Sequence, residues 1–346
     1  MSKKIFKEGG PHNIKKVGPE QYELSINIPI DEDGRVARKC PNDSCSPGYF
    51  KVKPGTGITE NQTEAYCPYC RFADEPSSFI SKEQVRYSKD QVAREAFKGI
   101  SKAIENGLGL GPSRKKRYGD KHFSMEMSFK PGRLPYVRPP SEEILKRDVV
   151  CPHCSLDHSV YGLATWCSDC GRDIFITHVE AEFDAIRAML KDTKRRQEEL
   201  GARVAQKDIE NALEDSVSVF EAALRSQVRR NLTERGVSEE EIENIFKNKI
   251  RNSFQNVTHA LKKTKEIVGK SVFEGIAEKD VELLNGIFLK RHPITHNLGI
   301  VDRKYLEKVR SGELEGRDVR VMEKEVERAI NIAFDSIADF HHALFS

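Results

Sequence analysis

The stretch Cys151-Pro-His-Cys154, followed after twelve intervening residues by Cys167-Ser-Asp-Cys170-Gly171, is the most informative part of this 346-residue sequence. Two C-x2-C pairs at this separation can place four thiolates at the corners of a tetrahedron around one metal ion. The proline after the first cysteine and the glycine after the last suit tight turns that direct backbone amides at sulfur. The pattern predicts a zinc ribbon whose ligands are Cys151, Cys154, Cys167 and Cys170.

The four remaining cysteines form an earlier cluster, Cys40, Cys45, Cys67 and Cys70. Its second pair is C-x2-C, but its first is C-x4-C, which is longer than the usual spacing. A hairpin of residues 49–53 and 63–66 would bring the two pairs together. We therefore expect two structural Zn2+ ions per chain, because closed four-cysteine sites leave no open position for water or substrate.

Other uses of these cysteines remain alternatives. Sulfur ligands alone also fit iron held as in rubredoxin. Disulfides fit poorly, because the chain has no apolar run of transmembrane length and begins without a secretory signal, so we expect a cytoplasmic protein with no membrane partner. His153 is expected to be an exposed loop residue, and Trp166, the only tryptophan, either a stacking platform for a base or packing for the ribbon.

Charge is distributed unevenly along the chain. Lys and Arg exceed Asp and Glu before residue 150, and the reverse holds after it. The densest basic segment interleaves with Tyr118, a combination that suits phosphate contact and base stacking, although solvated surface charge is the simpler reading. The candidate nucleic-acid contacts are Arg114, Lys115, Lys116, Arg117 and Lys121.

Hydrophobic periodicity and composition predict a multidomain α+β protein, with two small zinc ribbons built on short β-strands and then an all-α helical bundle. The expected divisions are 1–75 (strand and first ribbon), 76–147 (helix, basic loop and strand), 148–176 (second ribbon), 177–204 (linker helix) and 205–346 (helical domain). Residues 191–199 lack apolar side chains, so the linker helix is expected to run partly free in solvent.

One segment of the helical domain carries candidate chemistry: Arg291-His292-Pro293-Ile-Thr-His296-Asn297, followed by Gly299-Ile-Val-Asp302 and Tyr305. It resembles the signature of HEPN domains, helical bundles that include many prokaryotic defence and toxin ribonucleases. The resemblance covers roughly residues 205–346. It departs from the pattern at Pro293, which lies inside the motif, where proline removes an amide and strains a helix.

The resemblance implies metal-independent RNA cleavage in a composite cleft between the helical domains of a homodimer. His296 would act as general base or acid, and Arg291 would stabilise negative charge in the transition state. His292 and Asn297 would position the phosphate or share proton transfer. The rival hypothesis, favoured by Pro293, is a non-catalytic adaptor that binds nucleic acid or a protein partner through its ribbons and dimerises through its helices.

Overall fold

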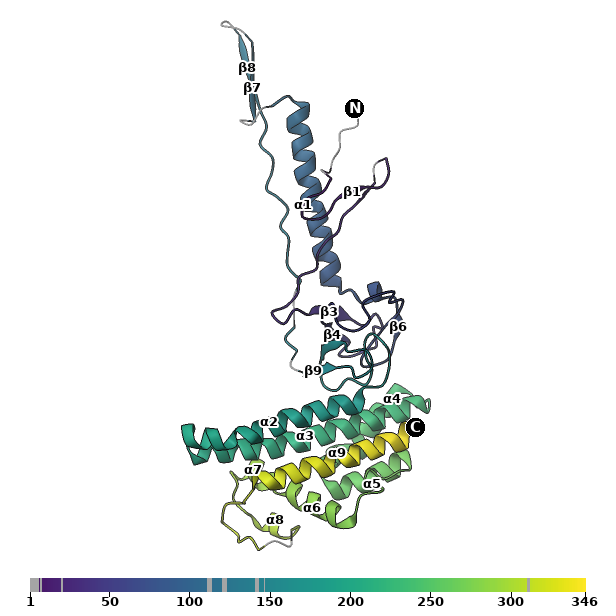
Figure 1. Ribbon diagram of the computed structural model, residues 1–346, viewed down its shortest axis with the longest axis vertical. Coiled ribbons are helices and arrows are strands. Elements are labelled where there is room, and N and C mark those ends of the chain that lie inside the picture. The colour runs from purple at the N-terminus through teal and green to yellow at the C-terminus, as the bar shows by residue number, and fades with distance from the viewer. Residues whose placement is uncertain are drawn as a thin grey trace.

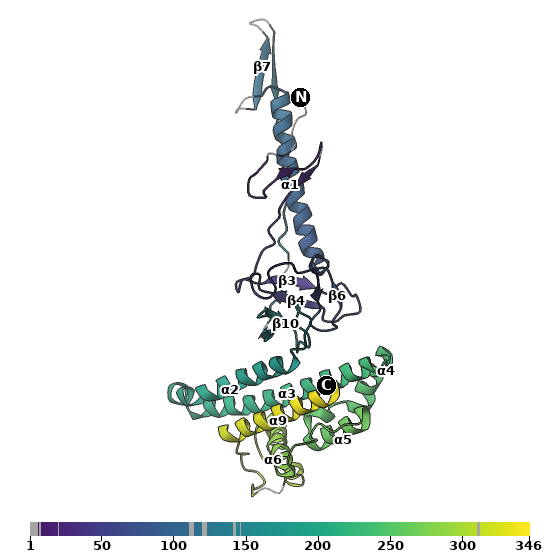
Figure 2. The ribbon, with the colours of Figure 1, turned by 45° about the vertical axis from the view of Figure 1, so that its right-hand side comes forward.

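The computed structural model describes residues 6, 8–19, 21–110, 114–119, 123–140, 143–145, 147–309 and 312–346. The molecule is elongated, with a helical bundle at one end, a small β-rich body in the middle and a long arm at the other end (Figures 1 and 2). Small antiparallel sheets followed by a helical region agree with the predicted α+β class.

The β-rich body, called here the cysteine module (residues 31–80 and 147–174), is organised by one four-stranded antiparallel sheet. Its strand order is β3 (Val36–Lys39), β4 (Tyr49–Val52), β10 (Asp157–Val160) and β9 (Arg147–Val150). Strands β3 and β4 come from the first cysteine cluster, and β9 and β10 come from the second. The two clusters therefore share one sheet, although the sequence suggested two separate ribbons.

The core and the ion pairs of the cysteine module also bridge its two halves. Phe50 and Cys67 of the first half pack in one apolar cluster with Val160 and Cys167 of the second. The buried Arg35 guanidinium lies 2.9 Å from Asp157, on the opposite half. The expected hairpin of residues 49–53 and 63–66 is wrong: β4 pairs with β3 and β10, and β5 (Ala65–Tyr66) pairs with β6 (Ala73–Asp74).

The arm (residues 82–140) leaves the module after a short 3-10 helix, η1 (Pro76–Phe79). Its main element is α1 (Lys82–Gly107), whose first turn is capped reciprocally by Ser81 and Gln84. At 1.5 Å per residue α1 is about 39 Å long. A hairpin of β7 (Lys115–Gly119) and β8 (Ser124–Ser128) stands at the far end, and a smaller hairpin of β1 (Lys15–Lys16) and β2 (Tyr22–Glu23) lies beside α1 (Figure 1). The predicted basic loop is thus partly a strand.

The helical region contains eight α-helices in the described residues, together with a π-helical turn, η2 (Ile245–Ile250), and a 3-10 turn, η3 (Ser253–Gln255). The helices are α2 (Phe175–Leu200), α3 (Ala202–Glu234), α4 (Glu239–Asn244), α5 (Val257–Val268), α6 (Glu278–Leu289), α7 (Arg291–His296), α8 (Arg303–Leu306) and α9 (Glu323–Phe345).

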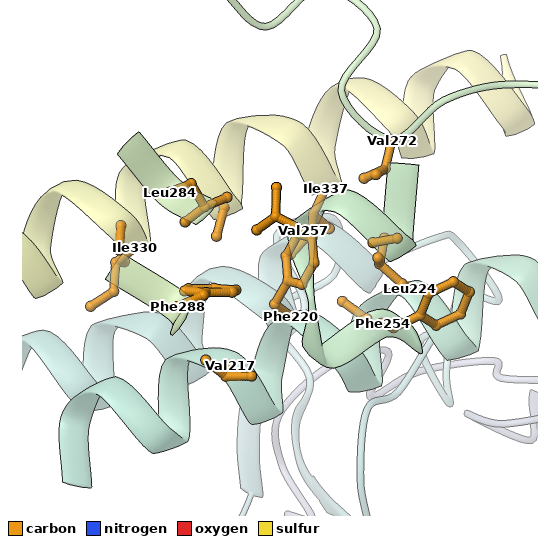
Figure 3. Close-up of a cluster of buried hydrophobic side chains, with 14 of the residues drawn as sticks. Val217, Phe220, Leu224, Phe254, Val257, Val272, Leu284, Phe288, Ile330 and Ile337 are labelled. Atoms are coloured by element: carbon orange, nitrogen blue, oxygen red, sulfur yellow. The ribbon is translucent and has the colours of Figure 1, made fainter. Parts of the chain in front are cut away.

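Apolar stripes at helical spacing hold this bundle together. Figure 3 shows Phe220 and Leu224 of α3 facing Phe254, Leu284 and Ile337. Helix α2 belongs to the same core, because Phe183 and Leu190 are buried in it. Its last turns also contact α3, where Arg196 pairs with Asp208 at 2.7 Å. The segment expected to be a linker helix is therefore one side of the bundle, joined to α3 by a tight turn.

A polar and aromatic joint attaches the cysteine module to the bundle. Asp173, just after the last cysteine, pairs with Arg230 of α3 and lies 3.3 Å from His341 of α9. The Arg230 guanidinium is 4.3 Å from the ring centre of Trp166 and 3.8 Å from that of Phe345. The module and bundle are thus held by contacts from three separate segments.

Candidate metal centres and candidate active site

The four cysteines of each cluster converge on one point. Their sulfur atoms lie within 4.8 Å of one another in each cluster. The closest pairs are Cys40 with Cys70 and Cys45 with Cys67, both at 3.6 Å, and Cys154 with Cys167 at 3.5 Å. A tetrahedral Zn2+ with bonds of about 2.3 Å separates its sulfurs by about 3.8 Å, whereas a disulfide needs about 2.05 Å. The spacing fits a metal ion and excludes disulfides in this arrangement.

Tight turns position these sulfurs. After Cys70, Cys154 and Cys170, the next residue takes a left-handed backbone conformation, and its amide donates to the carbonyl of the first cysteine of the pair. Gly171 suits this conformation by lacking a side chain. The C-x4-C pair is built differently: Gly48, with φ +60°, returns the chain so that its carbonyl accepts from the Cys40 amide at 2.7 Å. The longer spacing therefore still completes a four-sulfur site.

Crowding and burial perturb the thiols of both clusters. Contacts with Cys45 and Cys70, together with burial, raise the pKa of the Cys67 thiol. Burial likewise raises the pKa of Cys167. Four crowded thiolates repel one another unless a positive charge lies among them, and a metal ion supplies that charge. The free energy of metal binding then also stabilises the fold of the module. Both donor sets fit a metal ion, with all eight predicted cysteines brought together as expected.

Neither residue flagged beside the second cluster contributes a ligand. His153 is exposed, and its Nε2 lies 3.3 Å from the Asp173 carbonyl oxygen. Trp166 is 9% exposed, and the guanidinium groups of Arg71, at 4.2 Å, and Arg230, at 4.3 Å, lie over its ring. The ring is therefore covered, so it packs the joint and does not present a platform for a base.

The basic segment lies on the hairpin at the end of the arm. Every residue of β7 is exposed. The antiparallel register places Arg117 opposite Glu126 on one face and Tyr118 opposite Met125 on the other. Arg114 precedes the strand and pairs with Glu105 of α1 at 2.7 Å, whereas Lys121 lies outside the described residues.

The arm carries the whole excess of positive charge. Residues 82–140 hold 14 Lys and Arg against 6 Asp and Glu, whereas the rest of the chain holds 43 against 48. A two-stranded hairpin packed on neither face is marginal by itself. Concentrated positive charge on a protruding element is the electrostatic pattern of an anion-binding surface.

The second candidate site is α7, a single short helix that begins immediately after α6. Pro293 is its third residue, within the first turn, where backbone amides have no intrahelical partner. The proline therefore sits where a helix tolerates it, and Arg291 through His296 are continuous helix. Pro293 and Ile294 are buried, so they fix the inner face of α7 while the histidines face outward.

Helical spacing brings His292 and His296 together. They are four residues apart, and their ring centres are separated by 5.1 Å at an angle of 57°. His296 is exposed and His292 is partly buried. Burial lowers the pKa of His292, which the nearby Asp302 carboxylate only partly offsets. A neutral imidazole thus stands beside an accessible one.

Arg291 and Asn297 point to structural partners. The Nη1 of Arg291 donates to Oε1 of Gln255 at 2.9 Å, and Gln255 donates in turn to Glu221 of α3 at 2.7 Å. The Nε of Arg291 is buried and has no partner in the described part of the chain. Asn297 donates to the Ile300 carbonyl at 2.8 Å and closes the loop after α7.

Sequence reasoning missed Gln255 and Glu214, which hold the α7 region. Glu214 of α3 accepts from the Thr295 hydroxyl at 3.0 Å. Both lie more than 30 positions from the motif, and neither pattern nor spacing marks them.

Comparisons with family models, curated proteins and solved structures find no match for this chain. None of the described helices is both long and apolar enough to cross a membrane.

Proposed function

We propose that the chain is a metal-independent endoribonuclease whose helical region is HEPN-like and whose active site is centred on His292 and His296. The single observation that carries this proposal is the pairing of two imidazoles at 5.1 Å on an outward face of α7. Cleavage of RNA by its own 2′-hydroxyl needs one group to accept the hydroxyl proton and another to protonate the leaving oxygen.

The two histidines supply these groups within one chain. His292, with its lowered pKa, is neutral near pH 7 and acts as the base, because a base must be unprotonated. The exposed His296 acts as the acid. Arg291 adds a permanent positive charge one residue away, which favours negative charge developing at the site. A homodimer through the helical region would place two such pairs in one cleft.

The cysteine clusters serve as two structural zinc sites in this proposal. Each supplies on the order of 10 kcal/mol to the folding of a module whose own core is small. The arm supplies RNA affinity through Arg114, Lys115, Lys116 and Arg117, and Lys121 extends the same sequence segment. We also propose that the protein acts in the cytoplasm, in defence or toxin biology.

The experiment that tests this function is end-group analysis of the products. Purified protein is incubated briefly with RNA in excess EDTA, and zinc content is measured before and after. The expected products carry 2′,3′-cyclic phosphate and 5′-hydroxyl ends, because attack by the neighbouring 2′-oxygen gives this cyclic product first. Products with 3′-hydroxyl and 5′-phosphate ends would contradict the proposal.

A second candidate function is a non-catalytic adaptor that binds nucleic acid or a protein through the arm and module. The observation that favours it is distance: the basic hairpin and α7 lie at opposite ends of the molecule (Figure 1). The bond between Arg291 and Gln255 also gives this arginine a packing role. If wild-type protein binds RNA tightly but does not cleave it, the result would support the adaptor function over the nuclease function.

A further inference from the structure

A cavity of about 350 Å3 lies between the two halves of the cysteine module. Phe50, Phe79 and Leu156 form its apolar floor, and each is almost fully buried. Arg38 and Asp169 are among the polar side chains of its wall. Because the lining comes from both halves, the cavity exists only where the two cysteine clusters share their sheet.

Two cations, Arg38 and Lys53, line this cavity. Lys53 lies 3.8 Å from the Asp157 carboxylate, whereas Arg38 is poorly satisfied within the protein. It lies on β3, and its guanidinium makes one long hydrogen bond, from Nη1 to the Ala37 carbonyl oxygen at 3.4 Å. No carboxylate of the described residues lies within 4 Å of it. A half-buried guanidinium without a bidentate partner favours an acceptor supplied from outside.

Asp169 is the anion of the cavity and is held rigidly. Its Oδ2 accepts from the Ile58 amide at 2.9 Å, and its Oδ1 accepts from the Gln62 side chain at 3.2 Å. Gly57, with φ +76°, lets the loop wrap this closely, since a Cβ there would stand 2.1 Å from Oδ2. Each oxygen keeps a second lone pair for a ligand donor.

We propose that this cavity binds one unpaired guanine base of RNA. Guanine presents two acceptors, N7 and O6, on one edge, and these match an arginine fork. Its N1–H and exocyclic amino group present donors on another edge, and these match a carboxylate. Adenine and cytosine carry an amino donor at the position of O6, and uracil has no paired donors for Asp169. The apolar floor accepts the faces of the base.

This inference rests on the proposed function only in taking RNA as the ligand, and it names the feature of RNA that is recognised. Binding is therefore measured on RNA that cannot be cut. The probes are fluorescent pentamers with 2′-O-methyl groups throughout, UUGUU and UUAUU, titrated with zinc-loaded full-length protein. The expected result is about tenfold tighter binding of the guanine probe, the usual effect of one bidentate pair.

Variants assign the preference to the two side chains. Arg38→Ala and Arg38→Lys should both remove it, because lysine keeps the charge but not the fork. Asp169→Asn should remove it as well, and Gln62→Ala should weaken it by loosening Asp169. Lys39→Ala is the matched control, since Lys39 is the next residue of β3 and is exposed, and it should keep the full preference. Zinc content is measured for every variant.

Equal binding of the two probes would overturn the inference. So would a guanine preference that survives Arg38→Ala with both zinc ions in place, or equal competition by inorganic phosphate and guanosine monophosphate, which would indicate a general anion site. A failure of the proposed cleavage appears separately, as uncut unmodified RNA, and leaves this binding result unaffected.

Discussion

Val52 in the first half of the cysteine module lies directly opposite His158 in the second, and this strand pairing makes one sheet from segments about a hundred residues apart. His158 is fully buried, and burial lowers its pKa to about 3, so it is neutral at physiological pH. The two metal sites therefore stabilise a common structure and should not behave as independent ribbons.

The first prediction is that the two sites lose metal together. Wild-type protein should contain about two zinc ions per chain by elemental analysis. Cys167→Ser removes a buried ligand of the second site, and we expect well below one ion per chain, because Cys67 and Cys167 share one core. A variant that retains one full equivalent would show that the ribbons fold independently.

The second prediction concerns the joint between module and bundle. Contacts with His341, the Phe175 amide and Arg230 outweigh the effect of burial and lower the pKa of Asp173 from 3.8 to about 2. A carboxylate with a depressed pKa stabilises the fold fully above its unfolded pKa, and this stabilisation is lost as pH falls from about 4 towards 2. Asp173→Asn should therefore cost about 2 kcal/mol of unfolding free energy at pH 6, and the cost should not grow at pH 8.

Urea unfolding of wild type and Asp173→Asn at both pH values checks this result. Asp184→Asn is the control, because Asp184 is exposed on α2 and pairs only with Arg187 of the same helix in the described structure. It should change the unfolding free energy by less than about 0.5 kcal/mol. A cost for Asp173→Asn no larger than that of the control, or one that grows from pH 6 to pH 8, would contradict the prediction.

The third prediction concerns the arm. Replacing Arg114, Lys115, Lys116 and Arg117 with glutamine should weaken binding to single-stranded RNA and reduce the slope of log affinity against log salt by up to about 3, since each lost phosphate contact removes about 0.7. The matched control replaces four exposed lysines of the bundle: Lys247, Lys249, Lys262 and Lys265. Equal loss of slope in both variants would indicate that the arm has no special role.

The fourth prediction is a pH dependence set by His292. Because burial lowers its pKa from the ordinary value of 6.5, the cleavage rate should rise with pH on the acidic side and reach half of its maximum below pH 6.5, as the base becomes unprotonated. In His292→Ala this acidic limb should disappear along with most of the rate. A rate that rises steadily through pH 8 would contradict the assignment of His292 as the base.

Local pattern predicted much of this structure. The cysteine spacing identified both sulfur clusters, and the apolar stripe containing Leu213, Val217 and Phe220 identified α3 and its buried face. The pairing of β4 with β10 could not be predicted, because strands of four residues carry no signal for their partners. The role of α2 was also missed, since the few apolar residues of its second half concealed the buried Thr193 and the ion pair of Arg196 with Asp208.

The candidate active site shows the same division between local and distant information. Spacing alone places His292 and His296 on one face of a helix, once Pro293 is recognised as a first-turn residue. The partner of Arg291 is Gln255, which lies 36 positions away, and only the packing of η3 against α3 reveals it. Contacts between residues that are close in sequence could be predicted, whereas contacts that depend on the packing of distant segments could not.

The central claim, that this imidazole pair cuts RNA, is tested most directly by the rate of RNA cleavage in excess EDTA for wild type, His296→Ala and the control His259→Ala. His259 is an exposed residue of a different helix, α5, and its replacement should leave the rate unchanged. His296→Ala should lose at least about a hundredfold while remaining folded, the usual effect of removing one acid–base group. Cleavage at the wild-type rate in His296→Ala would contradict the account.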